Sequence, residues 1–135
     1  MSEGVVLDAN ILHPIALCDL LLRLALEGLY RPLWSAEILE ETKRSILRRR
    51  PDLDRRALGA RMVAMQRALP AALVTGYEAR VDEFAALGQD AHVLAAAVHA
   101  GAGVIVTDNL RDFPAAALRP HGIKAQTADQ FLVRH

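Results

Sequence analysis

Short apolar runs of strand length alternate with longer helical patterns along this chain. Residues 4–8 and 103–107 are too short for helices and rich in β-branched side chains, which predicts two buried strands. A third strand is expected near residues 123–125, and Leu73-Val74 is a candidate for another short one. Strands that alternate with helices predict an α/β sandwich built on a small parallel sheet.

Helical periodicity and end signals predict the elements between these strands. The expected helices cover residues 19–27, 36–49, 55–68, 78–86, 90–100 and 114–118, with a last one from residue 128. Ser35 is a good N-cap for helix 36–49, and Asp52 or Asp54 for the next helix. Helix 19–27 carries leucine on all sides, which predicts a buried helix, and Arg31-Pro32 is expected to begin a connection.

Length and composition indicate one globular domain over residues 1–135. The chain is 53% hydrophobic but only 4% aromatic, which is typical of a helix-rich protein. Charges interrupt every long apolar stretch, and the N-terminus lacks the features of a signal peptide, so we expect a soluble, cytoplasmic protein without a membrane span. Cys18 is the only cysteine, which excludes an internal disulfide.

The formal net charge of zero conceals an uneven distribution of basic residues. Between Lys43 and Arg67, nine basic side chains stand against only two acids, Asp52 and Asp54. Such a cluster is typical of solvated helix surfaces, and equally of a surface that binds a phosphate backbone. Both interpretations stay open at this point.

Polar side chains follow two of the predicted strands. Asp8 ends the first strand, while Asp108 and Asn109 follow the second, with Asp112 shortly after them. Each also has a structural interpretation as a turn or capping residue. Because the carboxyl ends of parallel strands form the edge at which sites develop, these distant residues are expected to meet there.

Two further acids lie on helices that can reach the same edge. Asp90 stands at the start of the alanine-rich helix, where an N-cap role is the alternative. Glu41 lies beside the buried stripe of helix 36–49, whereas Glu40 is offset from it. Two carboxylates about 4 Å apart repel by roughly 4 kcal/mol at an effective dielectric near 20, and a divalent cation reverses that sign. Since Mg²⁺ and Mn²⁺ prefer such oxygen ligands, the pattern predicts metal-dependent phosphodiester cleavage.

Four segments carry a resemblance to PIN-domain nucleases, most closely the VapC toxins of bacterial toxin–antitoxin pairs. Residues 7–12 resemble the first family motif, 35–41 the second, 90–97 the third and 107–114 the fourth. Together they span nearly the whole chain. The resemblance implies a Rossmann-like three-layer α/β/α sandwich with a small parallel sheet, in a single PIN-like domain.

The resemblance also implies roles for individual residues. Catalytic roles fall on Asp8, Glu41, Asp90 and Asp112, and metal ligation on Asp8, Asp90, Asp112 and Asn109. Many family members carry Asp at the position of Asn109, so Asp108, Asn109 and Asp112 are all candidates to complete the site, with Asp112 preferred. The implied activity is a Mg²⁺- or Mn²⁺-dependent endoribonuclease that acts on RNA. A homodimer and inhibition by a cognate VapB-type antitoxin are implied as well.

Two other functions compete with this one. A catalytically silent PIN-like module would bind RNA or protein through the basic helices. Phosphoryl transfer by an aspartyl nucleophile at Asp8 resembles the haloacid dehalogenase type, but such enzymes need a second Asp two residues on, where this chain has Asn10. The retention of all the acids favours the nuclease.

The two histidines of the alanine-rich helix are a separate question. His92 and His99 are seven residues apart, so they share a helical face and suggest a metal pair. Asp90 is expected on the other side of the helix from His92, and no third ligand is in place. We therefore interpret both histidines as packing or surface residues.

Overall fold

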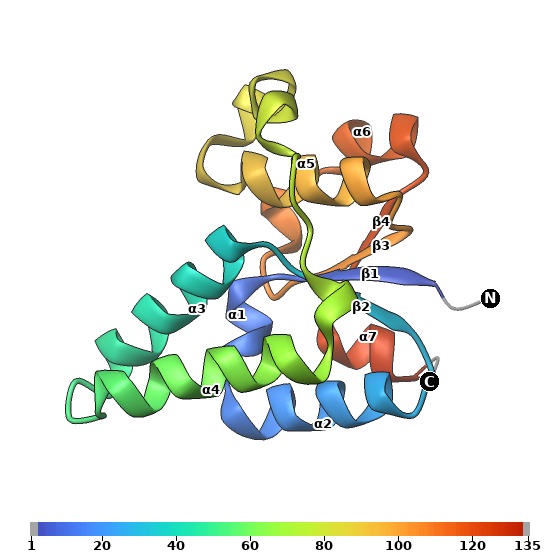
Figure 1. The fold of residues 1–135 in the computed structure, drawn as a ribbon. Helices are drawn as coiled ribbons and strands as arrows, with labels where there is room; N and C mark the ends of the chain where they lie inside the picture. Colours follow the sequence, from blue (N-terminus) through green and yellow to red (C-terminus); the bar gives the residue numbers. More distant parts are fainter. Residues whose placement is uncertain (1–2, 134–135) are drawn as a thin grey trace.

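A four-stranded parallel sheet forms the centre of the computed structural model, which describes residues 3–133 (Figure 1). Its strands are β1 (Gly4–Leu7), β2 (Arg31–Leu33), β3 (Val104–Val106) and β4 (Lys124–Gln126), in the order β2-β1-β3-β4. Every residue of β1 and β3 is buried. Helices cover both faces of a parallel sheet, so its central strands need continuous apolar side chains, and these two runs supply them.

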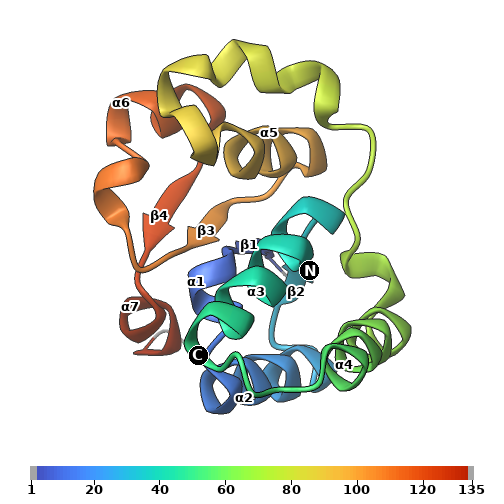
Figure 2. The same cartoon turned by 90° about the vertical axis from the view of Figure 1, so that its left-hand side faces the viewer.

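Helices lie on both sides of the sheet. They are α1 (Ala9–Leu12), α2 (Ile15–Leu26), α3 (Ala36–Arg49), α4 (Arg55–Ala68), α5 (Ala91–Ala100), α6 (Ala115–Leu118) and α7 (Ala128–Val133). Four 3₁₀ segments join them: η1 (Pro70–Ala72), η2 (Glu78–Asp90), η3 (Leu110–Asp112) and η4 (Arg119–His121). Figures 1 and 2 show α5 and α6 on one side of the strands, and α2 and α7 on the other. The predicted three-layer α/β/α sandwich is confirmed.

The ends of α3 and α4 agree with the sequence prediction, because side chains next to each helix fix them. The Ser35 hydroxyl accepts a hydrogen bond from the Ile38 amide at 3.1 Å. The Asp54 carboxylate accepts one from the Arg56 amide at 2.9 Å. Each cap satisfies an amide that has no partner within its helix.

The connection predicted at Arg31-Pro32 is wrong, because these residues form strand β2. Pro32 pairs with Val5 of β1. Proline cannot donate a hydrogen bond, and so it is tolerated mainly in edge strands, which is the place of β2 in this sheet. The predicted strand at Leu73 is reduced to an isolated bridge with Trp34.

Helix α2 begins earlier than predicted and is not buried all round. It starts at Ile15, and its inward side places Cys18 and Leu21 in the core. On the outer side, Leu20 is 43% exposed and Leu26 is 62% exposed. The many leucines of this helix predicted burial on all sides, but one side of α2 is exposed. The reason is that α2 lies at the outside of the lower layer (Figure 1). Among residues 3–133, no helix is long and apolar enough to cross a membrane.

Helix α5 packs closely against the sheet through small side chains. Residues 91–97 are all buried, and four of them are alanine. The helix predicted over 78–86 is part of the 3₁₀ segment η2, which leaves helical geometry at Phe84 and at Gly88, where φ is 61°. Because only glycine adopts a positive φ without strain, Gly88 allows the sharp change of direction before α5. The start of α5 then faces the carboxyl ends of β1 and β3.

Candidate active site

Asp8 follows directly on strand β1 and is held in place by short hydrogen bonds. Its own amide donates to the Val106 carbonyl of β3 at 3.1 Å. The carboxylate, in a residue that is only 6% exposed, accepts hydrogen bonds from the Ala9 amide at 2.8 Å and the Thr107 hydroxyl at 2.9 Å. Asn10 donates to the same carboxylate at 3.4 Å. Burial raises the pKa of Asp8, and the bonds from Thr107 and Ala9 oppose that rise.

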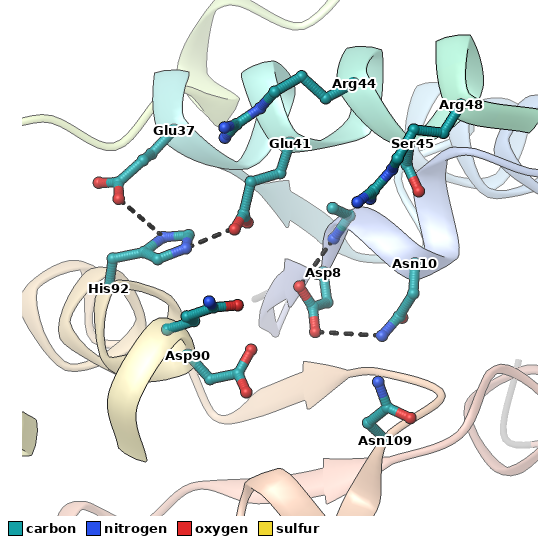
Figure 3. Close-up of a pocket in the computed structure, with 12 residues that line it drawn as sticks. Asp8, Asn10, Glu37, Glu41, Arg44, Ser45, Arg48, Asp90, His92 and Asn109 are labelled. Atoms are coloured by element: carbon teal, nitrogen blue, oxygen red, sulfur yellow. Dashed lines mark hydrogen bonds and ion pairs between the residues drawn. The ribbon is translucent and has the colours of Figure 1, made fainter. Parts of the chain in front are cut away.

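A pocket of about 600 Å³ opens at this edge of the sheet. Figure 3 shows that its side chains come from the end of β1, from α3, from the start of α5 and from the loop after β3. The polar groups at its centre are Asp8, Asn10, Glu41, Asp90, His92 and Asn109. The structure therefore brings together residues that are up to about a hundred positions apart in the chain.

Asp90 occupies the N-cap position of α5 but makes no capping hydrogen bond. Its carboxylate points into the pocket instead (Figure 3). Burial, together with the nearby Asp8, Asp112 and Glu41, raises the pKa of Asp90 to about 6. The capping alternative is thus excluded, and Asp90 belongs to a group of mutually repelling acids.

The three residues after β3 that could complete the acidic site, Asp108, Asn109 and Asp112, lie in different positions. Asn109 lines the pocket, and its amide donates to the Thr107 hydroxyl at 3.1 Å. Asp112 lies outside the pocket lining but close enough to Asp90 to interact with it electrostatically, and it does not cap α6, whose N-cap is Pro114. Asp108 is exposed, and its amide donates to the Asn10 side chain at 3.0 Å.

Glu41 lies on α3 and faces His92, which is buried, in agreement with the packing alternative. Nε2 of His92 is 3.1 Å from Oε1 of Glu41, and the imidazole is 6% exposed. Asp90 was expected on the other side of the helix from His92, but both residues line the same pocket. Asp90 precedes the first turn of α5, so the spacing of residues around a helix does not determine where its side chain lies. His99, by contrast, is exposed as expected, and its Nδ1 accepts a hydrogen bond from Arg80.

The donor chemistry of the pocket suits a hard cation. Within residues 3–133, no three His, Cys, Asp or Glu side chains form a group that could hold a metal ion on their own. Mg²⁺ usually keeps several waters and takes only one or two carboxylates from a protein. Asp8, Asp90 and Asn109 supply such oxygen atoms, and a cation beside them relieves the repulsion that raises the pKa of Asp90.

Comparison with known proteins agrees with this architecture. The PIN domain family matches residues 4–111. A segment of 45 residues is 58% identical to a protein of Mycobacterium tuberculosis (strain ATCC 25618 / H37Rv) named "Putative ribonuclease VapC50"; it covers 33% of this chain and 27% of that relative. No solved structure matches the chain. The family match covers most of the sheet and all the elements that line the pocket, and the chain belongs to the PIN domain family.

Proposed function

We propose that this protein is a metal-dependent endoribonuclease and the toxin of a VapBC-type toxin–antitoxin pair. The observation that carries the proposal is the meeting of Asp8, Glu41 and Asp90 in one open pocket, from three separate elements. A pocket that is open to solvent admits a polymer, and its carboxylates suit a divalent cation. The name of the mycobacterial relative supports RNA as the substrate class.

Each residue has a distinct part in this proposal. Asp8, Asp90 and Asn109 would hold a Mg²⁺ or Mn²⁺ ion, which would supply activation of water and stabilisation of negative charge on the phosphate. Asp112 acts on Asp90 through its charge, from outside the pocket lining. Glu41 orients the attacking water as a hydrogen-bond acceptor. The bonds from Ala9 and Thr107 keep the Asp8 carboxylate in a fixed orientation.

Two arginines of α3 are placed to bind RNA phosphates beside the acids. Arg44 and Arg48 are one helical turn apart, and both line the pocket (Figure 3). Both are exposed, and neither forms an ion pair with an acid in the described part of the chain. Guanidinium groups bind phosphate strongly, so this pair accounts for part of the basic cluster that the sequence analysis left open.

The proposal extends to the assembly of the protein. We infer a single PIN-like domain over residues 1–135, a homodimer and a VapB-type antitoxin that covers the site. Apolar side chains on the outside of α2, among them Leu20 and Leu26, support association with another chain. Light scattering of the purified protein, alone and with the antitoxin, measures both assemblies.

The central experiment compares RNA cleavage by the wild-type protein and Asp8→Asn, in Mg²⁺ or Mn²⁺ and in EDTA. We expect EDTA to abolish cleavage, and Asp8→Asn to lower kcat by about 100-fold or more, because a neutral amide cannot balance the cation charge. Asp82→Asn, an exposed acid of η2 outside the pocket, is the control and should cleave like the wild type.

Two outcomes would contradict the proposal. Full cleavage by Asp8→Asn would remove the acid site from the mechanism. RNA binding that weakens with salt, without any cleavage, would instead favour the catalytically silent binding module.

A further inference from the structure

His92 lies between two glutamates of α3. Nε2 of its ring is 3.1 Å from Glu41 Oε1, and Nδ1 is 3.9 Å from Glu37 Oε2 (Figure 3). Glu37 and Glu41 are four residues apart, so their side chains lie on the same face of the helix. A single imidazole from α5 therefore faces both carboxylates and connects the two helices that flank the pocket.

The ring of His92 is buried where α5 contacts α3. Both ring nitrogens are buried and make no regular hydrogen bond within the described residues, and each of them faces a carboxylate of α3. Glu37 is held from its other oxygen, which accepts a hydrogen bond from the Tyr77 hydroxyl at 2.8 Å.

Glu41 needs such a partner because of the acids opposite it. Glu41 lines the same pocket as Asp8 and Asp90, so three carboxylates of like charge face one open space. The Glu41 side chain is 32% exposed and has free rotation about several bonds. Repulsion from Asp8 and Asp90 favours rotation of Glu41 toward the solvent unless a partner on its other side holds it.

We propose that His92 is a positioning residue that bridges Glu37 and Glu41 and holds the Glu41 carboxylate toward Asp8 for the reaction. This inference rests on the proposed nuclease function. It assigns no contact with RNA to His92, so its loss should affect the chemical step and leave substrate binding intact.

The kinetic test measures kcat and KM for one RNA in His92→Ala, His92→Gln and the control His99→Gln. We expect His92→Ala to lower kcat by about 10- to 100-fold with little change in KM, since residues that orient an active-site ligand have effects of this size. His92→Gln should recover part of the loss, because a glutamine amide is a neutral group that can donate a hydrogen bond to Glu41. His99→Gln, on the exposed part of the same helix, should behave as the wild type.

A second measurement needs no catalysis. The fall in Tm caused by His92→Gln should be smaller in a Glu41→Gln background than in the wild type, because the contact between His92 and the Glu41 carboxylate is already lost there. Equal losses in both backgrounds, or a His92→Ala protein with wild-type kcat, would overturn the inference. If the wild-type protein cleaves no RNA while the two Tm losses differ, the bridge exists but the proposed function fails, so the two failures are distinguishable.

Discussion

Asp90 shows how a single residue in this site opposes the stability of the fold. Its pKa in the folded protein is about 6, whereas the ordinary pKa of aspartate is 3.8. The folded state thus binds this proton more tightly than the unfolded chain does. As the pH rises from about 4 to 6, the unfolded chain loses the proton first, and the free energy of unfolding falls. At pH values well above 6, Asp90 is ionised in both states, and its effect on the free energy of unfolding no longer changes with pH.

Asp90→Asn should therefore stabilise the protein at pH 8 and change its stability little at pH 4. The neutral amide removes the repulsion from Asp8, Asp112 and Glu41, which is present only when Asp90 is ionised. Thermal unfolding in EDTA at both pH values measures the effect. Asp82→Asn is the exposed control, and a Tm gain of the same size at both pH values would contradict the assignment.

Glu41 and His92 show a second feature at the residue scale. Their sequence positions are more than fifty residues apart, and each by itself has an ordinary interpretation as a surface acid or a helix histidine. The contact between the two side chains makes both of them candidates for a role in the site, which neither position indicates by itself. A buried histidine is protonated or neutral according to its partners, which only the three-dimensional arrangement supplies.

At the scale of elements, α3 carries most of the groups opposite the strand ends. Glu37, Glu41, Arg44 and Arg48 all line the pocket, and they follow one another along one side of the helix. The order from acid to base along α3 places the proposed phosphate contacts beside the proposed catalytic centre. The start of the helix is fixed by Ser35, so this cap also fixes the register of the whole series.

Ser35→Ala should lower the free energy of unfolding by about 1 kcal/mol, because it leaves the Ile38 amide without its cap. The loss should not be smaller than this typical value, because Ser35 is fully buried and water cannot replace the hydroxyl. Urea unfolding measures the change. Asp54→Ala, at the exposed cap of α4, should cost less, and an equal or larger loss there would contradict this explanation.

The arginines of α3 give a prediction about RNA binding. In an Asp8→Asn background, Arg44→Gln with Arg48→Gln should weaken the binding of single-stranded RNA. Two lost phosphate contacts reduce the slope of log K against log salt by about 1.4, at roughly 0.7 for each contact. Fluorescence anisotropy over a series of salt concentrations measures it.

The control for this prediction lies on α4. Arg55 and Arg56 are exposed and carry the same charge, but they do not line the pocket. Their double substitution to Gln should leave the slope nearer to that of the parent protein. Equal slopes for the two double variants would show that the basic cluster acts only through its total charge.

At the scale of the whole molecule, the parallel sheet explains why the site exists where it does. Parallel strands β1 and β3 are adjacent and end side by side, and Leu7 pairs with Val106. Whatever follows one strand must therefore lie beside whatever follows the other. This geometry joins Asp8 to Thr107 and Asn109, and α3 and α5 complete the pocket from the two sides (Figure 3).

The sequence was sufficient for features that depend on neighbours along the chain. The buried runs of β1 and β3, the caps of α3 and α4, and the acid at the end of β1 were all predicted from a few adjacent residues. Strand β2 and the exposed side of α2 were not predicted, because burial and pairing depend on what another part of the chain covers.

The sequence by itself determined the fold class, the four acidic segments and the resemblance that joins them. Only the tertiary structure decided that Asp90 does not cap α5, that Asn109 lines the pocket while Asp112 lies outside its lining, and that His92 faces Glu41. The physical reason is the distance along the chain over which each kind of interaction acts. Caps and strand patterns are set by hydrogen bonds and burial within a few residues, whereas the charge on a pocket side chain is set by groups that only folding brings near.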